Sequence, residues 1–155
     1  IITIILLSVY FTAGTQKYSV NTAQWGPDAR WSSPQELGGY IWLKQNLAPN
    51  TKVYPYSGED SLLTGMDMFV CGWCKETSEL REDILAKDPD QLHQFLKRNS
   101  YEYLLLDGMS FRTLAYQYGE NKTNEELPTK FNEIATSEKF SPIHQAQGLI
   151  VLRVA

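Results

Sequence analysis

The sequence predicts an α/β fold with a partly parallel sheet, helices on its faces and an antiparallel pair of strands at the C-terminus. Three observations favour this class. Segments with strand signals alternate with segments with helix signals along residues 33–155. Residues 103–106 form an apolar run, which is typical of a strand covered on both faces. The final segment contains two strand-like stretches that a turn at residues 145–148 separates.

The chain begins with sixteen uncharged residues, and the first thirteen are almost all apolar. A complete membrane-spanning helix needs about 20 such residues, and a buried strand needs about five or six. We interpret residues 1–14 as the outer end of a transmembrane helix whose beginning precedes Ile1. The alternative is a central β-strand over residues 1–9, because Ile, Thr, Val, Tyr and Phe also favour strands. Residues 15–32 are polar and aperiodic, which indicates a linker to a soluble domain over residues 33–155.

The first clear helix signal follows this linker. Ser33 can cap a helix, Pro34 suits its first position, and Glu36 completes a capping box. The side expected to face inward carries the apolar residues Leu37, Tyr40, Ile41 and Leu47. We expect the helix to end at residues 48–50 and a short strand to follow over residues 51–56.

The middle of the chain predicts a short strand at residues 68–70 and a helix over residues 78–87. Asp88 and Pro89 mark a second capped helix start, and this helix is expected to end at residues 98–99. Its apolar side carries Leu92, Phe95 and Leu96. A strand over residues 101–107 follows this helix.

Two more helices are expected before the C-terminal strands. Apolar residues recur at helical spacing over residues 111–118, and Gly119 is a typical helix stop. The second helix is predicted over residues 125–137, because Pro128 is best tolerated in a first helical turn.

The order of these elements resembles the extracytoplasmic C-terminal domain of GT-C-class glycosyltransferases. The matching positions are Trp42, Leu43, Lys44, Asn46, Pro49 and Val53, then Tyr103 to Leu106, and finally Ile150 to Val154. GT-C proteins are multi-span membrane enzymes that take sugars from polyprenyl-phosphate donors, and they include protein mannosyltransferase-like and oligosaccharyltransferase-like proteins.

In that class the catalytic carboxylates lie in loops between membrane helices. The resemblance therefore implies that this domain is a non-catalytic part of a membrane glycosyltransferase-like protein. It implies a place in the cell membrane with the soluble part on the extracytoplasmic side. The implied role is to support binding of a glycan or peptide acceptor, or of a partner.

The motif Cys71-Gly72-Trp73-Cys74 is the sharpest chemical feature. Three interpretations of this motif remain open: a structural disulfide, two ordinary thiols and a redox-active dithiol. The dithiol is considered because a helix that starts after the motif would lower the pKa of a thiol. The dithiol reading would make the protein a secreted thiol oxidoreductase, which is one rival function. Zinc would require two further ligands, and His93 and His144 lack the spacing for them, so we predict no metal.

Other candidate site residues belong to two chemical types. Exposed rings cover the apolar faces of sugars, so Trp25, Trp31 and Trp73 in predicted loops are candidates, although core packing is the commoner role of tryptophan. Carboxylates beyond the ends of strands lie where open α/β sheets bind ligands. The carboxylate candidates are Glu59, Asp60, Asp67 and Asp107, with ordinary turn-forming roles as the alternative.

The remaining signals limit the partners and the chemistry. The formal net charge is −4 without a basic stripe, so a nucleic-acid partner is not expected. The chain has neither a Gly-rich phosphate loop nor a G-x-S-x-G elbow, and we predict no cofactor. Asn121-Lys122-Thr123 is a glycosylation sequon in a predicted polar loop. A stand-alone α/β enzyme, with residues 1–9 as its central strand, is the other rival function.

Overall fold

The computed structural model describes residues 3, 12, 34–58, 66–146 and 148–155. The chain divides into two units, residues 1–32 and residues 33–155. Apart from Thr3 and Thr12, the segments predicted as a membrane-helix end, a central strand or a linker lie outside the described residues. None of the helices within the described ranges has the length and apolar composition of a membrane span.

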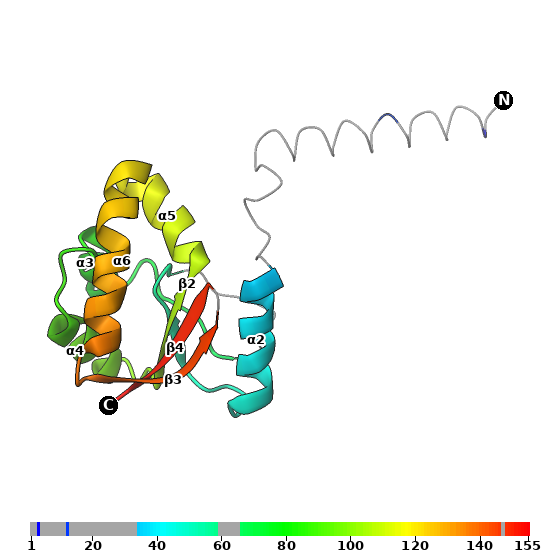
Figure 1. Cartoon of the computed structure of the whole chain (residues 1–155), viewed down its shortest axis with the longest axis horizontal. Helices are drawn as coiled ribbons and strands as arrows, with labels where there is room; N and C mark the ends of the chain where they lie inside the picture. The colour runs from blue at the N-terminus through cyan, green and yellow to red at the C-terminus, as the bar shows by residue number, and fades with distance from the viewer. Residues whose placement is uncertain (1–2, 4–11, 13–33, 59–65, 147) are drawn as a thin grey trace. The chain divides into compact units, whose positions relative to one another are not determined.

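The second unit has a mixed sheet, which confirms the predicted α/β class (Figure 1). Within the described residues the sheet has four strands in the order β1-β2-β4-β3. Strand β1 (Val53–Pro55) pairs in parallel with β2 (Tyr103–Asp107). Strand β4 (Leu149–Val154) pairs antiparallel with both β2 and β3 (Phe140–Ala146), and β3 with β4 forms the predicted C-terminal pair.

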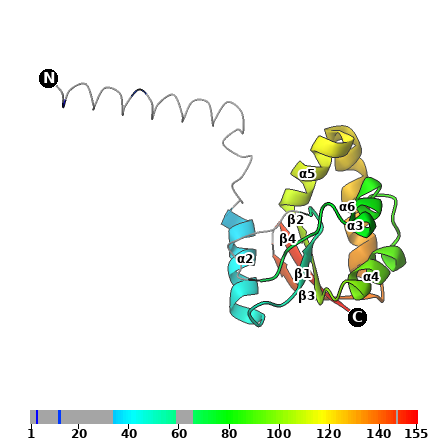
Figure 2. The same cartoon turned by 180° about the vertical axis from the view of Figure 1, so that it is seen from behind.

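Helices lie on both faces of this sheet (Figures 1 and 2). Helix α2 (Pro34–Asn46) covers one face. The helices on the other face are α3 (Lys75–Glu82), α4 (Pro89–Arg98), α5 (Gly108–Tyr118) and α6 (Glu120–Thr136). The sheet therefore separates two apolar clusters, and the larger one lies under the four helices.

Strand β2 contributes to both clusters. Successive side chains of a strand point to opposite faces. Leu104 and Leu106 belong to the larger cluster, whereas Leu105 packs with α2 residues Tyr40 and Leu43. The apolar run in the sequence is thus explained by a central strand that is covered on both sides.

Helix α2 packs closely on the sheet at Gly39. A Cβ atom at this buried glycine would lie 2.5 Å from Leu149 Cδ1, so a larger residue would require the Leu149 side chain or the helix to shift. The prediction that Ile41 faces inward is wrong, since 47% of this residue is exposed. The prediction for Tyr40 is confirmed, and Leu43 is buried beside it.

The predicted start of α4 is confirmed in detail. The Asp88 carboxylate accepts a hydrogen bond from the Gln91 backbone N–H at 2.7 Å, and Gln91 Oε1 accepts one from the Asp88 N–H at 3.1 Å. Pro89 occupies the first helical turn. This is a complete capping box, and it places the predicted apolar residues Leu92, Phe95 and Leu96 in the core.

The predicted bounds of two helices and one predicted strand are wrong. Helix α3 covers Lys75–Glu82 instead of residues 78–87. Residues 68–70 do not form a strand, because the backbone pairing next to β1 is limited to one bridge between Lys52 and Asp67. Helix α6 begins at Glu120, not at residue 125, so Pro128 lies inside the helix. Thr123 and Leu127 are buried one turn apart, and this packing favours helix before the proline.

Candidate functional site

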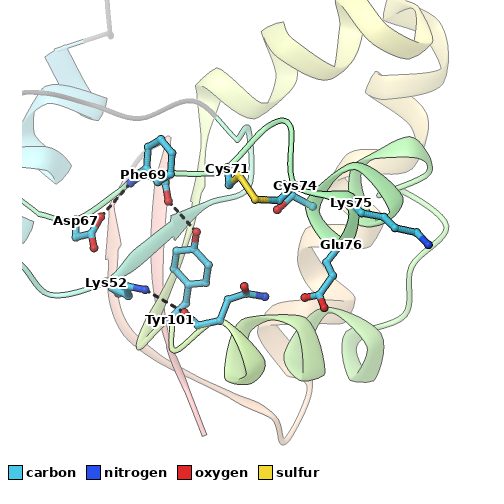
Figure 3. A pocket seen from close by; sticks show the side chains of 10 residues that line it. Lys52, Asp67, Phe69, Cys71, Cys74, Lys75, Glu76 and Tyr101 are labelled. Atoms are coloured by element: carbon cyan, nitrogen blue, oxygen red, sulfur yellow. Dashed lines mark hydrogen bonds between the residues drawn. A yellow bond between two sulfur atoms is a disulfide. The ribbon is translucent and has the colours of Figure 1, made fainter.

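A pocket of about 370 Å³ opens beside the amino ends of β1 and β2. Lys52 directly precedes β1, and Tyr101 lies two residues before β2, so the parallel pairing of the strands brings them together. The chain segment before α3 forms the opposite wall (Figure 3). The lining residues are Lys52, Asp67, Phe69, Cys71, Cys74, Lys75, Glu76, Thr77, Asn99 and Tyr101.

Hydrogen bonds to the backbone hold one side of this pocket in place. The Tyr101 hydroxyl donates to the Phe69 carbonyl at 2.8 Å, and the Phe69 N–H donates to the Asp67 carboxylate at 3.3 Å. Lys52 Nζ donates to the Asn99 carbonyl at 3.2 Å and lies 5.6 Å from the centre of the Tyr101 ring. The ammonium therefore lies between a carbonyl and an aromatic face, where a cation is favoured.

Burial raises the pKa of Tyr101 above its ordinary value, and the Asp67 charge adds to this effect. The Tyr101 hydroxyl thus keeps its proton at neutral pH and can act as a hydrogen-bond donor. Its bond to the Phe69 carbonyl uses this donor, so Tyr101 ties the loop to the sheet.

Two aromatic rings are exposed next to the pocket. Trp73 is 81% exposed and Phe69 is 54% exposed. Their ring centres lie 5.8 Å apart in an edge-to-face arrangement, so the two rings form one continuous apolar surface. The predicted candidate Trp73 is therefore not a core residue.

A disulfide joins Cys71 and Cys74 in the wall of the pocket (Figure 3). The Cys74 N–H also donates to the Cys71 carbonyl at 3.2 Å, which closes a tight turn that carries Trp73. Cys74 is the N-cap residue of α3. The disulfide and the turn together fix the position of the exposed tryptophan relative to the helix.

The carboxylates of the pocket have partners within the chain. Asp67 accepts the hydrogen bond from Phe69 described above. Glu76 points toward α4, where its carboxylate lies 3.8 Å from Arg98 Nη1 (Figure 3). An arrangement of engaged carboxylates beside exposed rings favours ligand binding over acid–base catalysis.

The other predicted ligand residues do not join this pocket. Trp25, Trp31, Glu59 and Asp60 lie outside the described residues. Asp107 is at the carboxyl end of β2 and is only 4% exposed. Its carboxylate caps α5 and accepts hydrogen bonds from Ser110 N, Ser110 Oγ and the Tyr40 hydroxyl. The structure therefore gives Asp107 the turn-forming role that was the alternative to ligand binding.

The sequon lies on a helix, not in the polar loop that we predicted. Asn121 is exposed in the first turn of α6, whereas Thr123 is fully buried. The loop prediction failed because α5 and α6 are joined directly at Gly119, which adopts a positive φ of 90°.

Sequence reasoning missed the polar half of the pocket. Lys52, Asn99 and Tyr101 showed no motif, and the signal that could have located them is the parallel pairing of the two strands. Across the described ranges there is no group of three or more His, Cys, Asp or Glu side chains placed to hold a metal ion. Comparison with known proteins adds no residue assignment, since neither a protein-family model nor a curated protein matches this chain.

Proposed function

We propose that residues 33–155 form a non-catalytic binding domain of a multi-span, GT-C-like membrane glycosyltransferase. The domain lies on the extracytoplasmic side of the cell membrane and supports binding of a glycan acceptor or of a glycosylated peptide. The enzyme's catalytic groups would belong to other parts of the longer protein. This proposal joins the sequence resemblance to the exposed aromatic pair beside the pocket.

The exposure of Trp73 is the observation that carries the proposal. The Trp73 ring is 81% exposed, and the disulfide-closed turn restrains the backbone that carries it, so only side-chain freedom is lost when a ligand stacks on the ring. Phe69 extends the apolar surface. Lys52 and Asp67 supply a donor and an acceptor for sugar hydroxyls at the adjacent pocket.

A titration of the 155-residue chain with a panel of oligosaccharides and glycopeptides tests this function. We expect saturable binding by calorimetry and shifts of the Trp73 indole N–H signal in NMR spectra. Trp73→Ala should weaken binding about tenfold or more, which is the size of effect found for aromatic contacts at binding sites. The matched control is Tyr116→Ala, because Tyr116 is also exposed (96%) but lies on α5. Unchanged affinity in Trp73→Ala, or no binding to any member of the panel, contradicts the proposal.

The disulfide supports the extracytoplasmic placement, since disulfides persist in oxidising compartments. In intact cells, a membrane-impermeant maleimide should label Cys71 and Cys74 after brief treatment with an impermeant reductant, and not before it. Labelling that requires cell lysis would place the domain on the other side of the membrane.

A further inference from the structure

The Cys71–Cys74 disulfide lines a surface pocket, and its two cysteines differ in exposure. Cys74 is exposed and Cys71 is half-buried. Both residues line the pocket (Figure 3). Exchange begins with attack of a thiolate on one sulfur of a disulfide, so access decides which sulfur reacts. Cys74 is the more exposed residue of the pair, so we expect an incoming thiolate to attack its sulfur first.

Cys74 also occupies the N-cap position of α3, with an extended backbone (φ −73°, ψ 132°). Asp88 has a similar backbone at the start of α4 (φ −74°, ψ 164°), where its side chain accepts a backbone N–H. The Cys74 side chain makes no capping hydrogen bond at the start of α3. A thiolate on Cys74 would stand where the Asp88 carboxylate stands in α4, and it would supply the missing acceptor.

The charged residues at the start of α3 do not supply this stabilisation of a Cys74 thiolate. Lys75 and Glu76 carry opposite charges, and each is paired with another residue, Glu79 and Arg98 respectively. Stabilisation of a thiolate therefore comes mainly from the N–H groups of the first turn of α3. The reduced form gains a helix cap that the disulfide form lacks.

The geometry points to a second activity, reversible thiol–disulfide exchange with peptide or protein thiols. Cys74 is the sulfur that forms the mixed disulfide, and Cys71 is the resolving partner. This activity does not rest on glycan binding. Phe69 lines the pocket with both cysteines, and Trp73 lies between them in the sequence; these exposed rings favour a thiol carried on an apolar peptide segment.

The exchange is balanced without a further oxidant. A thiolate of a dithiol peptide attacks Cys74 Sγ, the Cys71–Cys74 bond breaks, and Cys71 leaves as a thiolate that takes up a proton. The second peptide thiolate then attacks the peptide sulfur of the mixed disulfide and releases Cys74 as a thiolate. Two electrons pass from the peptide dithiol to the cysteine pair, and the products are a peptide disulfide and the reduced domain.

The first experiment measures the equilibrium of the oxidised 155-residue chain with glutathione. The matched control is a blocked Cys-Gly-Trp-Cys tetrapeptide, which has the same ring but lacks α3. We expect the equilibrium constant for reduction of the chain to be about tenfold larger than that of the tetrapeptide, the effect of one helix cap of ordinary strength. Equal constants, or a smaller constant for the chain, overturn the inference.

The second experiment tests which sulfur reacts. Cys71→Ser leaves Cys74 free, and Cys74→Ser leaves Cys71 free; serine is nearly isosteric, and circular dichroism checks that both variants are folded. With dithiodipyridine at neutral pH, Cys71→Ser should react about tenfold faster than Cys74→Ser. Equal rates, or faster reaction of Cys74→Ser, contradict the assigned roles. Glycan binding by the oxidised wild-type chain is unaffected by either result, so the two proposals fail separately.

Discussion

Helices α3 and α4 pack against each other on the same face of the sheet, but the chain starts them differently. Helix α4 begins with the complete capping box of Asp88 and Gln91 and buries three large apolar residues. Helix α3 begins at a disulfide-bonded cysteine, and its most buried residues are Thr77 and Leu80. The start of α4 is therefore stabilised by its cap and its buried residues, whereas the start of α3 carries a disulfide and exposed residues. The proposed binding and exchange would therefore involve a helix start that contributes less to the core than the start of α4 does.

The capped start of α5 should account for the largest loss of stability. Asp107 caps α5 as Asp88 caps α4, but Asp107 is buried and also accepts from the Tyr40 hydroxyl of α2. We expect Asp107→Ala to lower the free energy of unfolding by about 3 kcal/mol, because a cap and hydrogen bonds to a buried carboxylate are lost. Urea denaturation measures this change. Asp107→Asn, which keeps an acceptor oxygen, should lose less; a loss below about 1 kcal/mol in Asp107→Ala would contradict the structural role.

Tyr54 lies in the core under α3 and α4, and it makes the stability of this part of the fold depend on pH. Its ring contacts Phe95 of α4, with ring centres 5.5 Å apart. Burial raises the pKa of Tyr54 to about 12, and the Arg81 guanidinium of α3 partly offsets this rise. The native state then holds the phenolic proton more tightly than the unfolded state, whose pKa is about 10. The associated stability is complete below about pH 10 and is lost as the pH rises through about 12.

We expect this loss to reach about 2 kcal/mol, measured by urea unfolding between about pH 9 and about pH 12. Tyr54→Phe removes the titrating group and should show a weaker pH dependence. A slope remains in this variant, because burial also raises the pKa of Tyr56. Identical slopes in the wild type and in Tyr54→Phe would show that Tyr54 does not titrate as the structure implies.

A smaller effect is expected at the start of α4 itself. Asp88→Ala removes the acceptor of the capping box and should lower the free energy of unfolding by about 1 kcal/mol. Asp88→Ser keeps a capping oxygen and serves as the control. If both variants were equally stable, the hydrogen bond to the Gln91 N–H would not contribute measurably.

The smallest effect is expected from a substitution that gives α3 a capping carboxylate like that of α4. In a chain with Cys71→Ala, the further change Cys74→Asp places a carboxylate at the N-cap of α3, and Cys74→Ala is its control. The aspartate variant should be more stable than the alanine variant by about 0.5 kcal/mol, since this helix start is exposed. Equal stability would mean that an acceptor at position 74 does not cap α3, and it would also weaken the argument for thiolate stabilisation.

Much of the fold was predictable because its signals are local. The capping residues Asp88 and Pro89 placed α4, and the apolar run at residues 103–106 placed the central strand. The boundaries that failed depend on distant contacts. Asp67 pairs with the backbone of Thr51 and Val53, so the end of this pairing is set by where the chain returns to β1. Nothing within residues 68–70 indicates that limit.

The candidate site was predicted in part by residue type. Cys71, Cys74 and Trp73 were identified because their chemistry is evident within four residues. The polar half comes from contacts between distant parts of the chain: Lys52 and Asn99 are 47 positions apart, and Phe69 and Tyr101 are 32 positions apart. The predicted carboxyl-edge residue Asp107 instead caps α5, because the backbone N–H groups at the start of a helix compete for the same carboxylate.

The helical sequon has a consequence for the order of events during biosynthesis. A transferase that glycosylates Asn121 must also reach Thr123, whose side chain is on the buried side of α6 once that helix has packed. Such tripeptides are normally modified in accessible loops. A sugar at Asn121 would therefore have to be attached before α6 packs, and the fraction of molecules that carry it would reflect the competition between glycosylation and the folding of residues 120–136.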